Sequence, residues 1–202
     1  MRFVQDHKVT NRPSIAELPP GQQLAAPGKW PFVGERLPAD SAEPWSVEIC
    51  GLVDRPTRLS LEELRRLPLV EAMVDIHCVT RWSKLGMRFG GVSLQSLLDL
   101  AGCQAAARFV SFVARSPRAH STSLALDDAL QLGTLVALTA DDRPLESDHG
   151  GPVRTVVPGR YFYKSLKWLT RIELLADDRL GYWEAVAGYH NHADPWKEER
   201  YG

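Results

Sequence analysis

The sequence predicts an α+β domain in which short strands and short helices alternate along one chain. Its 202 residues are 44% hydrophobic and 24% charged, the composition of an ordinary globular protein with a sizeable core. Segments with period-two alternation occur beside segments with helical spacing and capping residues. No internal repeat interrupts this pattern, so one domain with an arm accounts for the chain.

The N-terminal part of the chain forms a segment of its own. Pairs such as Pro19-Pro20 and Pro27-Gly28 exclude long regular structure, because proline fixes its own dihedral angle and lacks a donor. We predict an extended arm over residues 1–40 and a domain over residues 41–202. Two roles are open for residues 30–34: a stretch draped over the domain, or one wall of a functional site.

The first elements of the domain are a strand and a helix. Residues 45–50 alternate as a half-buried strand does. Ser60 and Glu63 have the spacing of a capping box, in which each side chain accepts a hydrogen bond from the other's backbone. A helix is therefore expected to begin here, and Pro68 ends it.

The later elements follow the same two periodicities. Apolar residues at i, i+3, i+4 and i+7 predict a helix over residues 94–101, with Ser93 as N-cap and Gly102 as its C-terminal stop. The other predicted elements are strands over residues 72–79, 109–113, 134–138, 153–157 and 169–174, and a short helix over residues 126–130.

The strand over residues 72–79 brings Cys78 to a point where the sequence becomes polar and aromatic. Cys78 shares one strand face with Val74 and Ile76, whereas His77 lies on the other face. A free cysteine in such a place is usually a small buried hydrophobe, and the histidine is usually a hydrogen-bonding residue. On residue type alone this interpretation leads, and the alternative is a thiolate that binds a metal.

Two later stretches place cations beside glycine or aromatic residues. After the turn at residues 148–152, Arg154 interrupts an apolar strand, where it needs an anion or another acceptor. Residues 161–168 carry Lys164 and Lys167 among aromatic side chains, which suits a ring-bearing phosphorylated ligand. A surface segment with snorkelling lysines gives the same pattern.

The C-terminal tail is rich in aromatic residues and histidine. His190 and His192 would share one face of a strand and provide two zinc ligands. No third ligand accompanies them, so packing of the aromatic tail against the domain is the favoured interpretation.

Charge and cysteine usage narrow the function classes. A net charge of -1 gives no footprint for nucleic acid or an anionic membrane. No stretch approaches the roughly 20 apolar residues that span a bilayer. The N-terminus lacks an apolar signal core, and the 3 cysteines show no C-x-x-C spacing. We therefore expect a cytoplasmic protein with reduced thiols that does not span a membrane.

Four stretches, taken in order, resemble the sulfite-oxidase superfamily of molybdopterin oxidoreductases, and most closely its short single-domain members. They are residues 77–92, 149–158, 161–168 and 188–201. The resemblance implies an α+β fold around a twisted, partly barrel-like sheet. It also implies an oxidoreductase that binds molybdenum in molybdopterin, with the form that lacks a nucleotide favoured.

The resemblance assigns roles to individual residues. Cys78 is implied to be the single protein ligand of molybdenum, which suits a soft, deprotonated thiolate. Arg81 is a candidate catalytic cation that attracts an anionic or S-oxide substrate, and Arg88 and Arg160 are weaker candidates. The implied cofactor-binding residues are His77, Cys78, His149, Arg154, Ser165, Leu166 and Lys167.

The implied reaction is two-electron oxygen-atom transfer on a small-molecule substrate, an S- or N-oxide or an oxyanion. Electrons are expected from a separate electron-transfer protein or from a membrane or flavin redox partner, because the chain encodes no second redox centre. The alternative is a molybdopterin-binding carrier or partner subunit without turnover. A thiol hydrolase that uses Cys78 and His77 is less suitable, because adjacent strand residues point to opposite faces.

Overall fold

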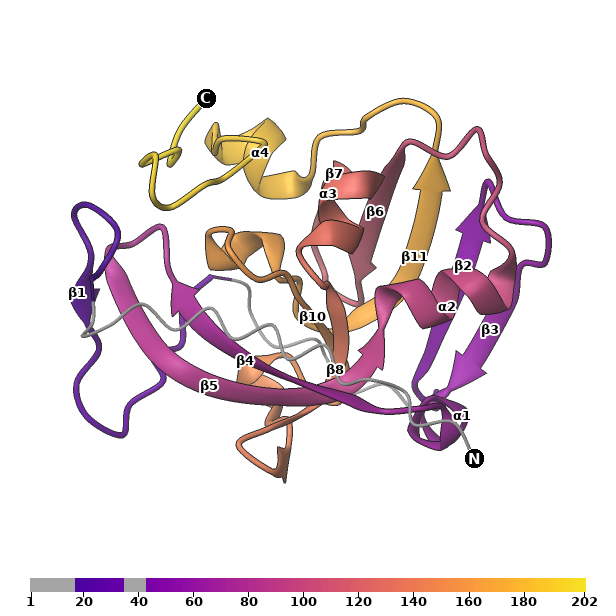
Figure 1. Cartoon of the computed structure of the whole chain (residues 1–202), viewed down its shortest axis with the longest axis horizontal. Coiled ribbons are helices and arrows are strands. Elements are labelled where there is room, and N and C mark those ends of the chain that lie inside the picture. Colours follow the sequence, from indigo (N-terminus) through magenta and orange to yellow (C-terminus); the bar gives the residue numbers. More distant parts are fainter. Residues whose placement is uncertain (1–16, 35–42) are drawn as a thin grey trace, which may run out of the picture.

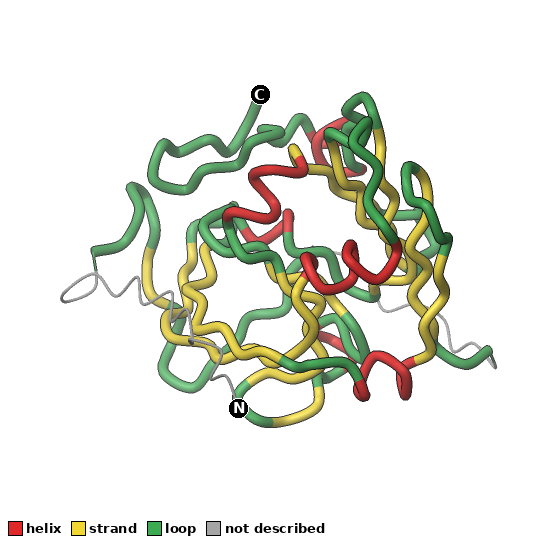
Figure 2. The backbone as a smooth tube through the Cα atoms, turned by 45° about the vertical axis from the view of Figure 1, so that its right-hand side comes forward, coloured by secondary structure: helices red, strands yellow, loops and turns green. Residues whose placement is uncertain are grey.

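The described strands form two sheets, with short helices packed against them (Figures 1 and 2). The computed structural model describes residues 17–34 and 43–202. In the first sheet, sheet A, the strand order is β1 (Gln23–Leu24), β5 (Trp82–Ser93), β8 (Leu135–Ala140) and β10 (Arg154–Val156), with β4 (Val70–His77) paired to β5 and β9 (Arg143–Pro144) paired to β8.

The second sheet, sheet B, contains strands from both halves of the chain. Its order is β3 (Thr57–Ser60), β2 (Ser46–Gly51), β11 (Leu169–Leu175), β6 (Phe109–Ala114) and β7 (Ser121–Ala125). The pairs β1–β5 and β11–β2 are parallel, and the other pairs in both sheets are antiparallel. The helices are α1 (Leu61–Arg66), α2 (Leu94–Ala101), α3 (Leu126–Gln131) and α4 (Tyr182–Ala187), and the short 3-10 helices are η1 (Ser147–His149) and η2 (Phe162–Lys164).

Strand β8 separates two hydrophobic cores. Val136 and Leu138 face the larger core, which sheet B, α2 and α3 also fill, whereas Leu135 and Ala137 face a smaller core with β4 and β5. Successive side chains of a strand point to opposite faces, so a strand that is apolar throughout is buried on both sides. The smaller core lies beside the end of β4, and it supports the residues that follow that strand.

Several predicted elements are confirmed by the structure. Helix α2 begins after Ser93, whose hydroxyl accepts from Ser96 N, and ends at Gly102, which has φ +74°. Helix α1 has the predicted capping box between Ser60 and Glu63. The α+β class is also confirmed. The resemblance implies one twisted, partly barrel-like sheet, whereas the described strands form a 6-stranded and a 5-stranded sheet.

The long strand β5 is absent from the sequence prediction. It contains Gly86, Gly90 and Gly91, and glycine weakens the local preference for a strand. A Cβ at Gly91 would lie 2.1 Å from Val136 O, so the close pairing of β5 with β8 requires glycine at this position. Strand β7 is a second element that sequence periodicity does not reveal.

Only part of the predicted N-terminal arm can be compared with the structure. Its residues 1–16 and 35–40 lie outside the described residues. Within residues 17–34, Gln23 and Leu24 pair with Trp82 and Ser83 of β5. No helix in the described part of the chain is long and apolar enough to cross a membrane.

Candidate functional site

A cavity lies where the end of β4 meets η1, η2 and the C-terminal segment. It holds about 630 Å³ of space that protein atoms do not fill, part of it open to solvent. We call it the Cys78 cavity. Its walls include Trp30, Pro31, Val33, Gly34, Cys78, Val79, Thr80, Trp82, His149, Arg154, Phe162, Tyr163, Ser165, Lys167, Trp183 and Tyr189.

A tight turn presents Cys78 to this cavity. Strand β4 ends at His77, two residues before the end of the predicted strand at residue 79. Cys78 N donates to Trp82 O at 2.8 Å, and Arg81 N donates to Cys78 O at 3.0 Å. The Cys78 Sγ lies 3.1 Å from Thr80 Oγ1. The thiol is thus held by backbone hydrogen bonds at the end of a rigid strand.

The surroundings of Cys78 act on its thiol in opposite directions. Burial raises the pKa of Cys78, and the hydrogen bond with Thr80 and the charges of Lys167 and Arg200 lower it by less. The thiol therefore keeps its proton to higher pH than an ordinary cysteine in the protein without metal. Metal binding requires the thiolate, so a metal at this position would displace the proton.

His77 is connected to the Cys78 turn by a chain of hydrogen bonds through Ser83 and Gln22. The Ser83 hydroxyl donates to Gln22 Oε1 at 3.1 Å, and Gln22 Nε2 donates to Cys78 O at 2.9 Å. His77 Nδ1 lies 2.8 Å from the same Ser83 oxygen, so it carries the proton and donates to Ser83. Burial lowers the pKa of His77, which favours the neutral ring. His77 is not among the residues that line the cavity.

Arg154 is buried in β10 and reaches the cavity wall. Its guanidinium donates to His149 O and Ser165 O, both at 2.7 Å, and to Thr155 O at 3.2 Å. It also lies over the Phe162 ring at 4.3 Å. Backbone carbonyls therefore serve as acceptors for this strand arginine, and its positive charge is fixed at the cavity.

Ser165 and Leu166 have different surroundings although they are neighbours. Ser165 lines the cavity, and its hydroxyl accepts from Val157 N at 2.9 Å. Leu166 packs into the larger core, and its N–H and carbonyl are both bonded to Thr155. The structure does not bring Leu166 to the cavity, because its side chain packs into the larger core.

Lys167 places a second cation on the wall. Its Nζ donates to Val33 O at 3.1 Å and lies 4.2 Å from the centre of the Phe32 ring. Trp30 stacks on His149 with ring centroids 3.9 Å apart. Burial lowers the pKa of His149, and the nearby Arg154 and Lys167 lower it further. The segment at residues 30–34 thus forms one wall of the cavity, the second of its two possible roles.

Three predicted substrate cations lie away from the cavity. Arg81 is exposed, and its side chain lies beside Gly21. Arg88 pairs with Asp142 at 3.3 Å, and Arg160 pairs with Asp128 at 3.6 Å. None of the three arginines belongs to the cavity lining. A catalytic role for Arg81 stays a prediction.

The histidines of the tail take part in packing. His192 Nδ1 lies 2.6 Å from Glu199 Oε2, and His190 Nδ1 accepts from the backbone of His192 and Ala193. Within residues 17–34 and 43–202, no group of three or more His, Cys, Asp or Glu side chains is arranged to hold a metal ion. These contacts shape the turn that follows Tyr189.

Sequence reasoning missed three aromatic residues of the wall. Trp82, Trp183 and Tyr189 line the cavity. Trp82 and Tyr189 lie in stretches that resemble the family, and Trp183 lies shortly before the last of these stretches, but no pattern in the sequence marks the three as cavity residues. Trp82 Nε1 is buried and has no hydrogen-bond partner among the described residues. A buried donor of this kind needs an acceptor, and a bound group with oxygen, nitrogen or sulfur atoms would supply one.

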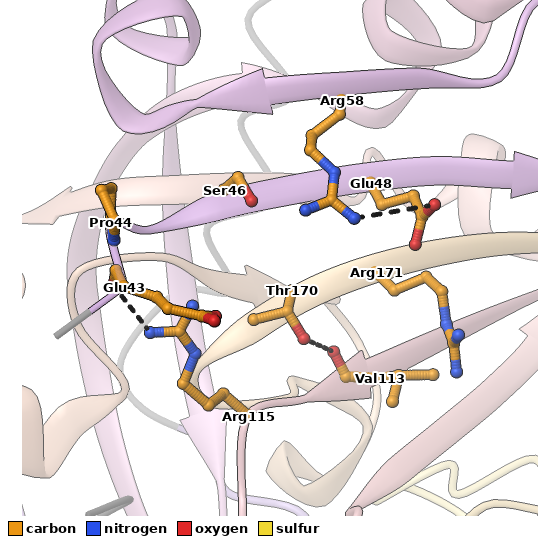
Figure 3. Close-up of a pocket in the computed structure, with 9 residues that line it drawn as sticks. All are labelled: Glu43, Pro44, Ser46, Glu48, Arg58, Val113, Arg115, Thr170 and Arg171. Atoms are coloured by element: carbon orange, nitrogen blue, oxygen red, sulfur yellow. Dashed lines mark hydrogen bonds and ion pairs between the residues drawn. The ribbon is translucent and has the colours of Figure 1, made fainter. Parts of the chain in front are cut away.

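A second groove lies on the outer face of sheet B and has a different character (Figure 3). Arg58 pairs with Glu48 at 4.0 Å, and Arg115 Nη1 donates to Glu43 O at 3.5 Å. Arg115 also stacks over the Trp45 ring at 4.3 Å. Arg58 and Glu48 thus form an ion pair, whereas Arg115 is held by a backbone carbonyl and an aromatic ring. The residues that line this groove include no cysteine or histidine, so it presents no chemistry comparable to the Cys78 cavity.

Known proteins resemble the chain over most of its length. The model of the oxidoreductase molybdopterin binding domain matches residues 35–183. The chain belongs to this family. Of the chain, 91% aligns at 35% identity with 91% of the uncharacterised oxidoreductase YuiH of Bacillus subtilis (strain 168).

More distant relatives of this molybdopterin oxidoreductase are longer. The chain is 27% identical to the protein-methionine-sulfoxide reductase catalytic subunit MsrP of Campylobacter jejuni and 32% identical to that of Gluconobacter oxydans. In each case 75% of the chain is covered, and it spans 57% and 55% of the two relatives.

A solved structure shares the fold. The sulfane dehydrogenase SoxCD of Paracoccus pantotrophus matches with a TM-score of 0.64 at 21% identity, over 72% of this chain and 41% of that chain. The family match identifies this chain as an oxidoreductase with molybdenum and molybdopterin as cofactor. The Cys78 cavity offers a thiol, two cations, an aromatic stack and an unpartnered donor, which suits such a group.

Proposed function

We propose that this oxidoreductase catalyses two-electron oxygen-atom transfer on a small S- or N-oxide or oxyanion, with Cys78 as the protein ligand of molybdenum. The observation that carries the proposal is the composition of the cavity. Of the described residues that line it, Cys78 alone offers sulfur, and Arg154 and Lys167 line the same space. A soft thiolate suits a metal, and the cations suit a phosphorylated pterin.

The remaining lining residues would hold the organic part of the cofactor. The stacked pair of Trp30 and His149 offers a flat surface with a neutral imidazole, because the His149 pKa is lowered. Trp82 Nε1–H has no acceptor among the described residues, and the cofactor would provide one. Ser165 belongs to this group as well. We include the nucleotide-free form of molybdopterin in the proposal, and mass spectrometry of the released pterin tests it.

When bound, the cofactor supplies the two-electron chemistry and the metal on which an oxygen atom is exchanged. The residues of the chain bind it, orient it and limit the access of water. Trp183 and Tyr189 form an aromatic wall near Cys78, and they leave little polar surface for bulk water. The Thr80 hydroxyl lies 3.1 Å from Sγ, so it would donate to the thiolate that metal binding requires and would hold the sulfur in one orientation.

Turnover requires electrons from outside the chain. We infer a separate redox protein, or a membrane or flavin partner, that exchanges electrons at the cofactor. MsrP is named a catalytic subunit, which supports such a division of labour. A cytoplasmic location also belongs to the proposal, and fractionation of cells that express the full chain tests it.

Metal analysis of Cys78→Ser tests the proposed function. We expect the wild-type protein, produced with molybdate, to contain molybdenum and a fluorescent oxidised pterin. Cys78→Ser should lose the oxygen-atom-transfer activity and most of the molybdenum, because a serine hydroxyl is a harder and weaker ligand than a thiolate. Cys103→Ser serves as the control, since Cys103 is exposed and lies outside the cavity.

Two results would argue against the proposed function. If Cys78→Ser keeps both molybdenum and activity, Cys78 is not the ligand. If the wild type binds pterin but gives no turnover with S- or N-oxides and no Mo(V) signal on partial reduction, the carrier alternative is correct.

A further inference from the structure

A fully buried lysine directly precedes Ser165 at the cavity. Lys164 is the last residue of η2, and its side chain is 0% exposed. Lysine is almost never buried to this extent unless it is paired. Lys164 does not line the Cys78 cavity, so contact with a bound cofactor does not explain its burial.

The Lys164 ammonium joins three distant parts of the chain. It forms an ion pair with Glu184 of α4, and it donates to Asn191 Oδ1 and to Ser123 O, each at 3.0 Å. Thr122 Oγ1 donates to the same Glu184 oxygen at 3.0 Å. Strand β7, helix α4 and the turn after Tyr189 are therefore held by one buried cation. In Figure 1, α4 and the yellow C-terminal segment lie above the orange segment that contains η2.

Two of these partners adjoin aromatic residues of the cavity. Trp183 directly precedes Glu184 in α4, and Tyr189 lies two residues before Asn191. Both aromatic side chains line the Cys78 cavity, and their rings stack with centroids 5.8 Å apart. The position of this aromatic pair therefore depends on the two segments that Lys164 binds.

Tyr163 provides a second link from the same turn. Its hydroxyl donates to His190 O at 2.6 Å, and its ring centroid lies 4.9 Å from that of Tyr189. Ser165 and Lys167, which follow in the sequence, also line the cavity, and both are expected to bind the cofactor. One turn of five residues thus supports two walls of the cavity.

We propose that Lys164 is a positioning residue, whose buried ammonium holds α4 and the turn at residues 189–191 so that Trp183 and Tyr189 form the aromatic wall beside Cys78. This proposal rests on the proposed function, because it places the substrate against that wall. The competing explanation is an ion pair that only stabilises the fold.

Two variants separate these explanations. Asn191→Ala removes the hydrogen bond from Lys164, together with the one that Asn191 Nδ2 donates to Asp178 Oδ2 at 2.6 Å. It leaves Lys164 paired with Glu184, so it creates no isolated buried charge. The double variant Lys164→Met/Glu184→Leu removes both charges together, which is often close to neutral for stability. Glu173→Gln is the matched control, because it breaks an ion pair with Arg179 that lies on sheet B outside the cavity.

Three quantities are compared among the variants. They are the molybdenum content, the KM and kcat for reduction of methyl phenyl sulfoxide by reduced benzyl viologen, and the hydrogen exchange of peptides that cover residues 182–191. In the assay the sulfoxide takes up two electrons, from two viologen radicals, and two protons, and it yields the sulfide and water.

We expect Asn191→Ala and the double variant to retain molybdenum and to raise KM about three- to tenfold, the effect of losing one hydrogen bond. We expect a smaller change in kcat and faster exchange over residues 182–191. Glu173→Gln should match the wild type in all three quantities.

Other outcomes have distinct meanings. Unchanged KM and exchange in both variants would overturn the positioning role, and so would activity that falls only in proportion to molybdenum. If the wild type contains no molybdenum and no pterin, the proposed function fails. Faster exchange over residues 182–191 in Asn191→Ala would in that case still support the link from Lys164 to the wall.

Discussion

Arg154 shows how one side chain combines a structural role with a place at the site. It is buried in a strand, and three carbonyl groups accept from its guanidinium. Two of these carbonyls belong to His149 and Ser165, which line the cavity themselves. The planar fork of arginine can bind all three groups at once, whereas the ammonium of lysine has a different shape and reach.

Arg154→Lys is therefore expected to destabilise the cofactor-free protein by about 2–4 kcal/mol, because buried carbonyl groups lose their donors. Urea denaturation measures this change. Arg171→Lys, on the exposed outer face of sheet B, is the control, and we expect a change within about 0.5 kcal/mol. Equal stability of the two variants would show that the carbonyl contacts of Arg154 contribute little.

His149 is expected to make the stability of the cofactor-free protein depend on pH. Its folded-state pKa is lowered below the ordinary value of 6.5, first by burial and then by Arg154 and Lys167. Between the folded-state pKa and pH 6.5, the His149 side chain therefore carries a proton in the unfolded chain and lacks it in the folded chain. This contribution to stability is fully present above pH 6.5 and is lost as the pH falls toward the folded-state pKa.

His149→Phe keeps an aromatic ring against Trp30 and removes the titrating group. We expect the Tm of the wild type to fall more steeply than that of His149→Phe as the pH decreases below 6.5. Differential scanning calorimetry across this range measures the two slopes. Parallel curves would mean that His149 titrates alike in the folded and unfolded states.

At the scale of elements, the predictions that succeeded rest on local signals. Both ends of α2 are set by side chains adjacent in sequence, namely the Ser93 cap and the left-handed Gly102. Strand β5 has no comparable signal. It forms because β4 and β8 pair with it on either side, and such pairing between distant residues overrides a weak local preference.

Gly91 is the point on β5 where this pairing is most demanding. In Gly91→Ala the new Cβ would meet Val136 O, a backbone atom, so β5 and β8 would have to separate. We expect a loss of at least about 3 kcal/mol in the free energy of unfolding. Gly86→Ala is the control: a Cβ meets nothing within 4 Å there, and the positive φ alone costs about 1–2 kcal/mol.

Denaturation curves of the two glycine variants test this contrast. If Gly86→Ala were the more harmful change, backbone conformation would matter more at β5 than its close contact with β8.

The same division between local and distant signals applies to the site. Cys78, His149, Arg154, Ser165 and Lys167 lie in stretches that resemble family motifs, and the structure brings all of them to one cavity. Trp183 lies outside these stretches. It and Tyr189 reach the cavity through long-range contacts, including the Lys164 ion pair, and no periodicity reveals such contacts. His77, Arg81 and Leu166 belong to the same motifs, but they are not among the residues that line the cavity.

At the scale of the whole molecule, the chain passes back and forth between the sheets. Strands β2 and β3 belong to sheet B, β4 and β5 to sheet A, β6 and β7 to sheet B, and β8 to β10 to sheet A, before β11 returns to sheet B. Neither sheet is made from one continuous part of the chain. The two cores also share β8, so neither sheet is expected to fold without the other.

We therefore expect a single cooperative unfolding transition for the cofactor-free protein. Phe89→Ala in the smaller core and Leu97→Ala in the larger core should each lower stability, by about 3–5 and 2–5 kcal/mol, within that same transition. Tryptophan fluorescence and far-UV circular dichroism should give coincident curves. Two separated transitions, each sensitive to only one of the variants, would contradict the shared core.

Arg200 has a consequence for the order of events during biosynthesis. Its guanidinium donates to Val79 O at 2.8 Å and to Pro20 O at 3.1 Å, so it links the cysteine turn to the N-terminal segment, from a position 121 residues after Val79 and 180 residues after Pro20. A ribosome-bound chain acquires this link only after residue 200 has left the exit tunnel. Until then the turn at Cys78 lacks the support of Arg200, so this side of the cavity is completed late in synthesis.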